Sequence, residues 1–184
     1  MMPGPRAAQA FRPAPDPVIP GSRQLSLVVG IDPGSRITGY GIVEHHGGDI
    51  AYVESGIIKV GRTASRPERL KTIKGRIDEI LARYRPDSMA VEEIFMARNP
   101  KSTMTLGEAR GVIILAAAEA GIQVYEYSPR EVKCSVVGSG AAHKSQVAYM
   151  IGKLFKLTHD LETDDESDAL AVAFCHTLRM TAGG

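Results

Sequence analysis

Four acidic side chains stand where they could hold metal ions together: Asp32, Glu92, Asp165 and Asp168. Asp32 follows a short apolar run and precedes Pro33-Gly34, a turn signal that ends a strand. In open α/β sheets, ligands bind at the carboxyl ends of the strands. Two carboxylates about 5 Å apart repel each other by roughly 3 kcal/mol at an effective dielectric constant near 20. Four converging acids would therefore need divalent cations among them, and an all-oxygen site suits Mg²⁺ or Mn²⁺.

Each acid also has a purely structural explanation. Asp32 could bond only to its own turn, and acids in the first turn of a helix are stabilised by its dipole by roughly 0.3–1 kcal/mol. Asp165 and Asp168 share one helix face because they are three positions apart. The apolar run after Asp168 turns this face toward the protein interior. If all four acids meet, a pair of metal ions would suit the cleavage of phosphodiester bonds.

The first half of the chain predicts three antiparallel strands followed by a helix. Residues 27–31, 35–44 and 50–58 are rich in β-branched residues, and Gly47-Gly48 joins the last two runs as a hairpin. Apolar residues then recur three and four positions apart over 67–84, which is the pattern of an amphipathic helix.

A further apolar run over 88–94 predicts a fourth strand. A helix between two strands favours parallel pairing, so this strand should lie beside and parallel to the first. Its end would bring Glu92 or Glu93 next to Asp32. Successive side chains of a strand point to opposite faces, so only one glutamate can face Asp32, and alternation leaves open which one.

The second half of the chain predicts four helices and one more strand. The helices are expected over 105–120, 129–138 and 143–157 and from about Asp165 onward, with the strand over 122–127. Part of the first helix, 111–118, is apolar nearly all round. That pattern indicates burial on more than one side, in the core or in a subunit interface.

Composition favours a single domain without a membrane span. The 184 residues can bury one core, and no apolar run approaches the roughly 18 residues of a transmembrane helix. Cys134 and Cys175 lack metal-binding spacing and are typical of reduced thiols in a cytoplasmic protein. The net charge of +1 does not by itself indicate a nucleic-acid-binding protein. Residues 1–23 hold six of the 11 prolines and predict a disordered tail before a domain over 24–180.

Five separated motifs resemble the RuvC family of Holliday junction resolvases. They occupy 30–41, 91–97, 106–111, 136–138 with 144–147, and 165–171. The resemblance runs from about Leu27 to Leu178 in the order of the expected elements. It implies an α/β, ribonuclease H-like fold, in which a mixed five-stranded sheet is flanked by helices. Strands one to three would form an antiparallel meander, with strands four and five parallel to strand one.

The resemblance also implies an activity and partners. Members of the family act as homodimers that resolve four-way DNA junctions by paired symmetric nicks, in recombination and repair. The cofactor implied is Mg²⁺, with two ions per active site, for which Mn²⁺ could substitute. A junction-binding and branch-migrating motor complex is the implied protein partner.

Residue by residue, the resemblance assigns metal binding to the four acids and chooses Glu92 over Glu93. It places Lys133 and Lys144 near the scissile phosphate as catalytic residues and stacks Phe95 on an unpaired base. The residues expected to contact DNA are Phe95, Arg98, Lys101, Arg110, Lys133 and Lys144. From the residues alone, Phe95 could instead be a core side chain, and the basic residues could be ordinary solvated charges.

Two other functions fit parts of the pattern. A phosphotransferase of the actin or sugar-kinase type also opens with an Asp and a Gly-rich hairpin. Such proteins use two related domains, and this chain has no second copy of the hairpin. A junction-binding module that does not cleave would use the acids as structural caps. Metal-dependent nicking of a synthetic junction separates such a module from a nuclease.

Overall fold

The structure is a computed structural model that describes residues 25–94, 100–158, 161 and 163–182. Within these residues the chain forms five strands and five helices. In chain order they are β1 (Ser26–Asp32), β2 (Ile37–His46), β3 (Asp49–Lys59), α1 (Arg66–Tyr84), β4 (Ser88–Glu92), α2 (Pro100–Glu119), β5 (Gln123–Tyr127), α3 (Pro129–Val137), α4 (Lys144–Leu154) and α5 (Asp164–Ala182).

The strands form one mixed sheet in the order β3-β2-β1-β4-β5. β1, β2 and β3 pair in antiparallel fashion, whereas β4 lies parallel to β1 and β5 lies parallel to β4. These directions confirm the predicted mixed sheet. They also place β1 at the centre of the sheet, so that its last residue has a neighbouring strand on each side.

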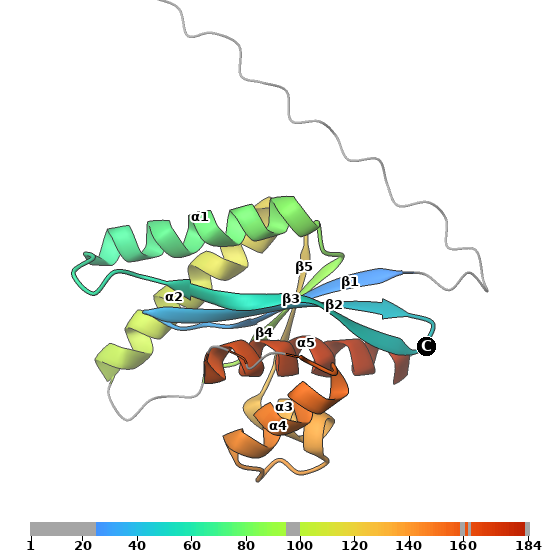
Figure 1. Cartoon of the computed structure of the whole chain (residues 1–184). Coiled ribbons are helices and arrows are strands. Elements are labelled where there is room, and N and C mark those ends of the chain that lie inside the picture. Colours follow the sequence, from blue (N-terminus) through green and yellow to red (C-terminus); the bar gives the residue numbers. More distant parts are fainter. Residues whose placement is uncertain (1–24, 95–99, 159–160, 162, 183–184) are drawn as a thin grey trace, which may run out of the picture.

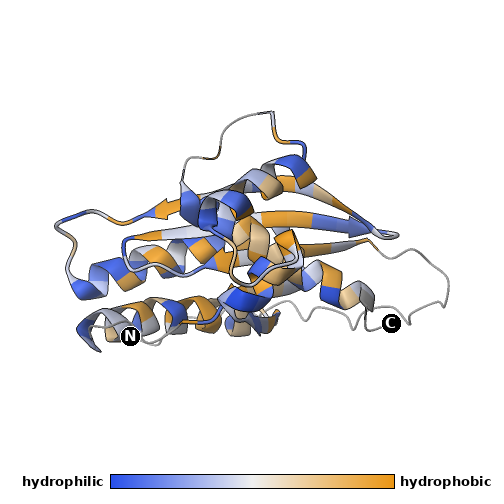
Figure 2. Ribbon diagram, turned by 90° about the horizontal axis from the view of Figure 1, so that it is seen from below, coloured by the Kyte–Doolittle hydropathy of each residue, from blue (hydrophilic) through white to orange (hydrophobic). Residues whose placement is uncertain are grey.

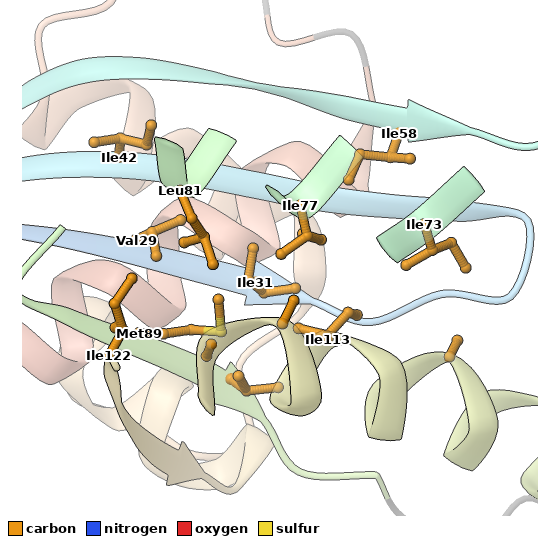
Figure 3. Packing of buried hydrophobic residues seen from close by; sticks show 14 of the residues in the cluster. Val29, Ile31, Ile42, Ile58, Ile73, Ile77, Leu81, Met89, Ile113 and Ile122 are labelled. Carbon is orange, nitrogen blue, oxygen red and sulfur yellow. The ribbon is translucent and has the colours of Figure 1, made fainter. Parts of the chain in front are cut away.

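Helices cover both faces of the sheet (Figure 1), with α1 and α2 on one face and α3, α4 and α5 on the other. Val29, Ile31 and Met89 point toward α1 and α2 and form part of the cluster in Figure 3. Val28 and Ala90 alternate with them and point to the α5 side. Figure 2 shows the result: hydrophobic residues predominate in the middle of the sheet, whereas hydrophobic and hydrophilic residues alternate along the helices.

Two helix boundaries differ from the predicted ones by more than one residue. α2 begins at Pro100 instead of near residue 105, because a proline is well tolerated in the first turn of a helix. Lys101, which precedes the predicted start of this helix, therefore lies within α2. α4 ends at Leu154 instead of residue 157. Two residues later, Lys156 adopts a left-handed backbone with φ of 51°, which a right-handed helix cannot continue through.

α2 packs one of its sides into this chain. Ala109, Ile113 and Ala117 are buried in the core, whereas Met104 and Leu115 expose 66% and 50% of their surface. Burial in the core is thereby confirmed for one side of the helix. Burial of the other side in a subunit interface stays a prediction.

Two sequence predictions concern the tail and membranes. The predicted tail, residues 1–23, lies outside the described residues, so the domain boundary at residue 24 stays a prediction. Among the helices of the described ranges, none is both long enough and apolar enough to cross a membrane.

A buried histidine links α5 to β4 and β5. His176 is 2% exposed. Its Nε2 lies 2.9 Å from Ser88 Oγ and its Nδ1 lies 2.7 Å from the Tyr127 hydroxyl. Burial lowers the pKa of His176 to about 4, so the ring is neutral at neutral pH. A neutral imidazole donates from one nitrogen and accepts at the other, which suits two hydroxyl partners.

We expect His176 to make the fold less stable as the pH falls from 6.5 toward 4. In that range the unfolded chain binds a proton at this ring that the folded chain does not bind. The pKa difference between 6.5 and about 4 corresponds to up to about 3 kcal/mol. Urea unfolding at several pH values should show a steeper loss for the wild type than for His176→Gln. Equal pH dependence in the two proteins would contradict this expectation.

Candidate active site

β1 and β4 end side by side, and each ends in an acidic residue. Ile31 pairs with Val91 across the parallel ladder, so the next residues, Asp32 and Glu92, are neighbours. Ile31 and Val91 both point into the core under α1 and α2. By alternation, Asp32 and Glu92 both point to the α5 side of the sheet. Glu93, in contrast, is exposed.

Glycines in β1 and β2 bring the start of α5 onto the same end of the sheet. Gly39 pairs with Asp32 across the antiparallel ladder. A Cβ atom at Gly39 would lie 1.9 Å from the carbonyl oxygen of Asp165. At Gly30 it would lie 2.2 Å from the carbonyl oxygen of Ala169. Only glycine fits at such distances, so the backbone of α5 lies directly on the strands, beside Asp32.

The sequence motifs did not predict that these glycines admit the backbone of α5. Glycine weakens the interior of a strand, and there it often marks a close approach of another backbone. Gly30, Gly39 and Gly41 all lie within β1 and β2. Their concentration in two neighbouring strands was a signal in the sequence that a helix would approach closely.

Like charges and burial raise the pKa values of the acids. Burial is the main cause at Asp32, followed by Glu92, Asp168 and Asp165, and together they raise the pKa of Asp32 to about 8. Burial, followed by the charge of Asp168, also raises the pKa of Glu92, although a hydrogen bond with Asp32 partly offsets this. Around neutral pH a proton on Asp32 therefore relieves the repulsion between the two side chains.

Lys144 directly neutralises the charge of Asp168. Its Nζ atom lies 3.0 Å from Oδ2 of Asp168, whose side chain is 17% exposed. This hydrogen bond raises the pKa of Lys144. Burial nevertheless raises the pKa of Asp168, because the lysine offsets the loss of solvation only in part.

Two adjoining hollows border the acids. One of about 220 Å³ is lined on its polar side by Glu92, Lys133, Lys144 and Asp168. The other, of about 210 Å³, is bordered by Asp32, Glu92 and Glu93. Lys133 is half-buried on α3, and its charge lowers the pKa of Glu92. The site thus offers carboxylates and two lysine side chains around these adjoining hollows, a combination suited to a phosphate and the cations that accompany it.

The side chains of the site have the oxygen donors that divalent cations prefer, but they are not yet arranged around a metal ion. Within the described ranges, no three His, Cys, Asp or Glu side chains are already arranged around a common metal position. Instead, Asp32 bonds to Glu92 and Asp168 bonds to Lys144. Carboxylate oxygens are nonetheless the donors that Mg²⁺ and Mn²⁺ prefer. Binding would require Asp32 to lose its proton and Asp168 to share its charge with the cation.

The other predicted site residues have different locations. Phe95 and Arg98 lie outside the described residues. Lys101 is exposed in the first turn of α2. Arg110, farther along α2, forms an ion pair with Glu126 of β5. The structure therefore brings together the four acids with Lys133 and Lys144, while Arg110 already has an acidic partner elsewhere.

A family model describes most of this chain. The model of crossover junction endodeoxyribonuclease RuvC matches residues 28–176. The chain belongs to the RuvC family. A RuvC crossover junction endodeoxyribonuclease of Pelotomaculum thermopropionicum is 47% identical over 155 residues, covering 84% of this chain and 94% of the relative. One of Marinobacter nauticus is 47% identical over 166 residues, covering 87% and 94%.

A solved structure of the RuvC family has the same fold. The structure of Thermus thermophilus RuvC in complex with a Holliday junction substrate matches with a TM-score of 0.81 and 34% identity. The match covers 86% of this chain and 96% of the RuvC chain. The family resemblance and the ribonuclease H-like fold predicted from the sequence are thereby confirmed.

Crowding of the acids predicts that Asp32→Asn stabilises the cation-free protein. The substitution removes a carboxylate that burial and like charges disfavour. In EDTA at pH 8.5 we expect a melting temperature several degrees higher, since 1 kcal/mol shifts it by roughly 2–4 °C in a chain of this size. Mg²⁺ should raise the melting temperature of the wild type more than that of the variant.

Asp164→Asn is the matched control, because Asp164 is an exposed acid in the first turn of α5 that is not one of the four acids of the site. It should change the melting temperature little. An Asp32→Asn protein that melts below the wild type in EDTA would contradict the destabilising effect of the Asp32 carboxylate.

Proposed function

We propose that this protein is a Holliday junction resolvase. It would cut four-way DNA junctions by paired symmetric nicks through metal-dependent hydrolysis of phosphodiester bonds, in recombination and repair. The observation that carries the proposal is the meeting of four acids from β1, β4 and α5 beside two lysines, in a chain of the RuvC family. Most of the acids are far apart in the sequence, so a common function explains their meeting better than separate capping roles do.

In this proposal the four acids hold two Mg²⁺ ions, for which Mn²⁺ could substitute. The ions would supply Lewis-acid activation of water and stabilise the charge that develops on the phosphate. Asp32 and Glu92 would hold them from the ends of β1 and β4, and Asp165 and Asp168 from the first turns of α5. Lys144 would exchange its contact with Asp168 for the scissile phosphate, and Lys133 would approach the same phosphate from α3.

Symmetric nicks on two strands require two active sites, so we propose a homodimer. The exposed apolar side of α2, with Met104 and Leu115, is one surface in the described part of the chain that suits a subunit interface. Stacking of Phe95 on an unpaired base, and DNA contacts by Arg98, Lys101 and Arg110, stay part of the proposal. So do a cytoplasmic location and a motor complex that binds and migrates the junction.

The first test compares the two neighbouring glutamates. Loss of a group that only supports a metal ligand already costs about 10–100-fold, so Asp32→Asn and Glu92→Gln should lose more activity than that. Glu93→Gln should keep most of its activity, because its side chain is exposed. Nicking of a synthetic four-way junction in Mg²⁺ measures all three variants, with circular dichroism as the test of folding.

Junction binding separates the nuclease from a non-cleaving module. Asp32→Asn should bind the junction at least as tightly as the wild type, because it removes a negative charge that faces phosphates. A wild-type protein that binds the junction but never nicks it in Mg²⁺ or Mn²⁺ would favour the module. An active Glu92→Gln beside a folded but inactive Glu93→Gln would overturn the assignment of the acids.

Lys144→Ala should lower the cleavage rate at saturating junction. A donor aimed at charge that develops in the transition state contributes about 100–1000-fold, whereas a contact to the DNA backbone alone would change only affinity and its salt dependence. Lys153→Ala is the control, since Lys153 is an exposed lysine on the same helix. An unchanged rate for Lys144→Ala at saturation would exclude the catalytic role.

A further inference from the structure

Glu166 is a buried carboxylate between two of the proposed metal ligands. It follows Asp165 and precedes Asp168 by two residues in the first turn of α5, yet only 4% of its surface is exposed. Burial of a carboxylate is unfavourable unless hydrogen bonds compensate for the lost water. The Ser55 hydroxyl of β3 supplies one such bond, donating to Oε1 of Glu166 over 2.7 Å.

A second hydroxyl extends this contact along β3. Tyr52 Oη lies 3.2 Å from Ser55 Oγ. Ser55 has a single hydroxyl proton, which it gives to Glu166, so the Tyr52 hydroxyl is the donor to Ser55. The three side chains form a chain of hydrogen bonds from the sheet to the first turn of α5.

An irregularity in β3 puts both hydroxyls on the α5 side of the sheet. Ile42 pairs with Glu54 and the next residue, Val43, pairs with Tyr52, so Val53 is an extra residue in β3. Such a bulge changes the face to which later side chains point. Tyr52 consequently packs with the core under α5, although it lies three residues from Ser55.

Ser55 also lies beside a residue of β2 on which α5 packs. It pairs with Gly41, where a Cβ atom would lie 2.7 Å from a methyl carbon of Leu170. Gly39 on the same strand lies under Asp165. The hydrogen bond between Ser55 and Glu166 therefore acts on the same helical turn that carries Asp165. It acts from β3, which lies on the other side of β1 from β4.

We propose that Glu166 is a positioning residue for the metal site. Through Ser55 and Tyr52 it fixes the rotation and height of the first turns of α5, so that Asp165 and Asp168 face Asp32 and Glu92. The glycine contacts bring α5 close to the sheet, and this bond determines which way its acids point. The inference rests on the proposed metal-dependent function.

Mg²⁺ binding in the absence of DNA tests this role. The melting temperature is followed against Mg²⁺ concentration for the wild type, Glu166→Ala, Glu166→Gln and Ser55→Ala. A ligand of the folded state stabilises it by RT ln(1 + c/Kd), where c is the Mg²⁺ concentration, so the rise in melting temperature gives Kd, the half-saturating concentration. For Glu166→Ala we expect the half-saturating Mg²⁺ concentration to rise about 10-fold, as for other groups that orient metal ligands. Glu166→Gln should stay close to the wild type, since its amide oxygen still accepts from Ser55.

Ser88→Ala is the matched control, because it removes a buried hydroxyl that bonds to α5 through His176, away from the acids. It should lower the melting temperature while leaving the half-saturating Mg²⁺ concentration unchanged. If Glu166→Ala does not fold, Ser55→Ala carries the test with a smaller rise in the same direction.

The possible outcomes distinguish this positioning role from the proposed metal-dependent function on which it rests. A wild type whose melting temperature ignores Mg²⁺ would contradict the proposed metal site itself. A wild type that responds to Mg²⁺, beside Glu166→Ala and Ser55→Ala variants that respond at the same concentration, would overturn only the positioning role. In that case Glu166 would contribute to stability alone, as Ser88 does.

Discussion

Repulsion between buried carboxylates governs the candidate active site. Asp32 has a pKa of about 8 because burial and three neighbouring acids all disfavour its charge. In the absence of cations, the fold limits this repulsion with a proton on Asp32 and with the salt bridge from Lys144 to Asp168. A divalent cation can replace both, since it neutralises several carboxylates at once. The stored repulsion thus gives the site a physical reason to bind Mg²⁺ or Mn²⁺.

Part of this repulsion, that of Asp168 and Asp165, follows from the close contact between α5 and the sheet, whereas Glu92 acts on Asp32 from β4. At Gly30 and Gly39, a Cβ atom would overlap the carbonyl oxygens of Ala169 and Asp165. Side chains at these positions would displace α5, and its acids would move away from Asp32. These glycines are therefore required because they have no side chain that would displace α5, and their conformational freedom is secondary.

The two faces of the sheet are held by different interactions. The face under α1 and α2 is a continuous apolar core (Figure 3). On the opposite face, α5 contributes four of the six buried polar residues in the described part of the chain: Glu166, Ser167, His176 and Thr177. Apolar contacts tolerate sliding, whereas hydrogen bonds have narrow distance and angle requirements. Polar anchors along α5 are thus suited to a helix whose acids must meet those of two strands.

The sequence by itself determined the elements and their order. The β-branched runs, the Pro33-Gly34 turn and the helical spacing of apolar residues are local signals, and local signals predict strands and helices well. The crossover helix predicted the parallel pairing of β1 and β4, which the structure confirms. The start of α2 lies earlier than the predicted residue 105, because Pro100 suits a first helical turn.

Tertiary structure alone decided how the acids are oriented. Both faces of β4 are covered by helices, so hydrophobic alternation could not choose between Glu92 and Glu93, whereas the register with β1 does. Glu166 lies in a run of acids that is typical of a solvated helix start, and only its contact with Ser55, 111 residues away, makes it a buried anchor. Such distinctions depend on distances between segments far apart in the chain, which local periodicity does not encode.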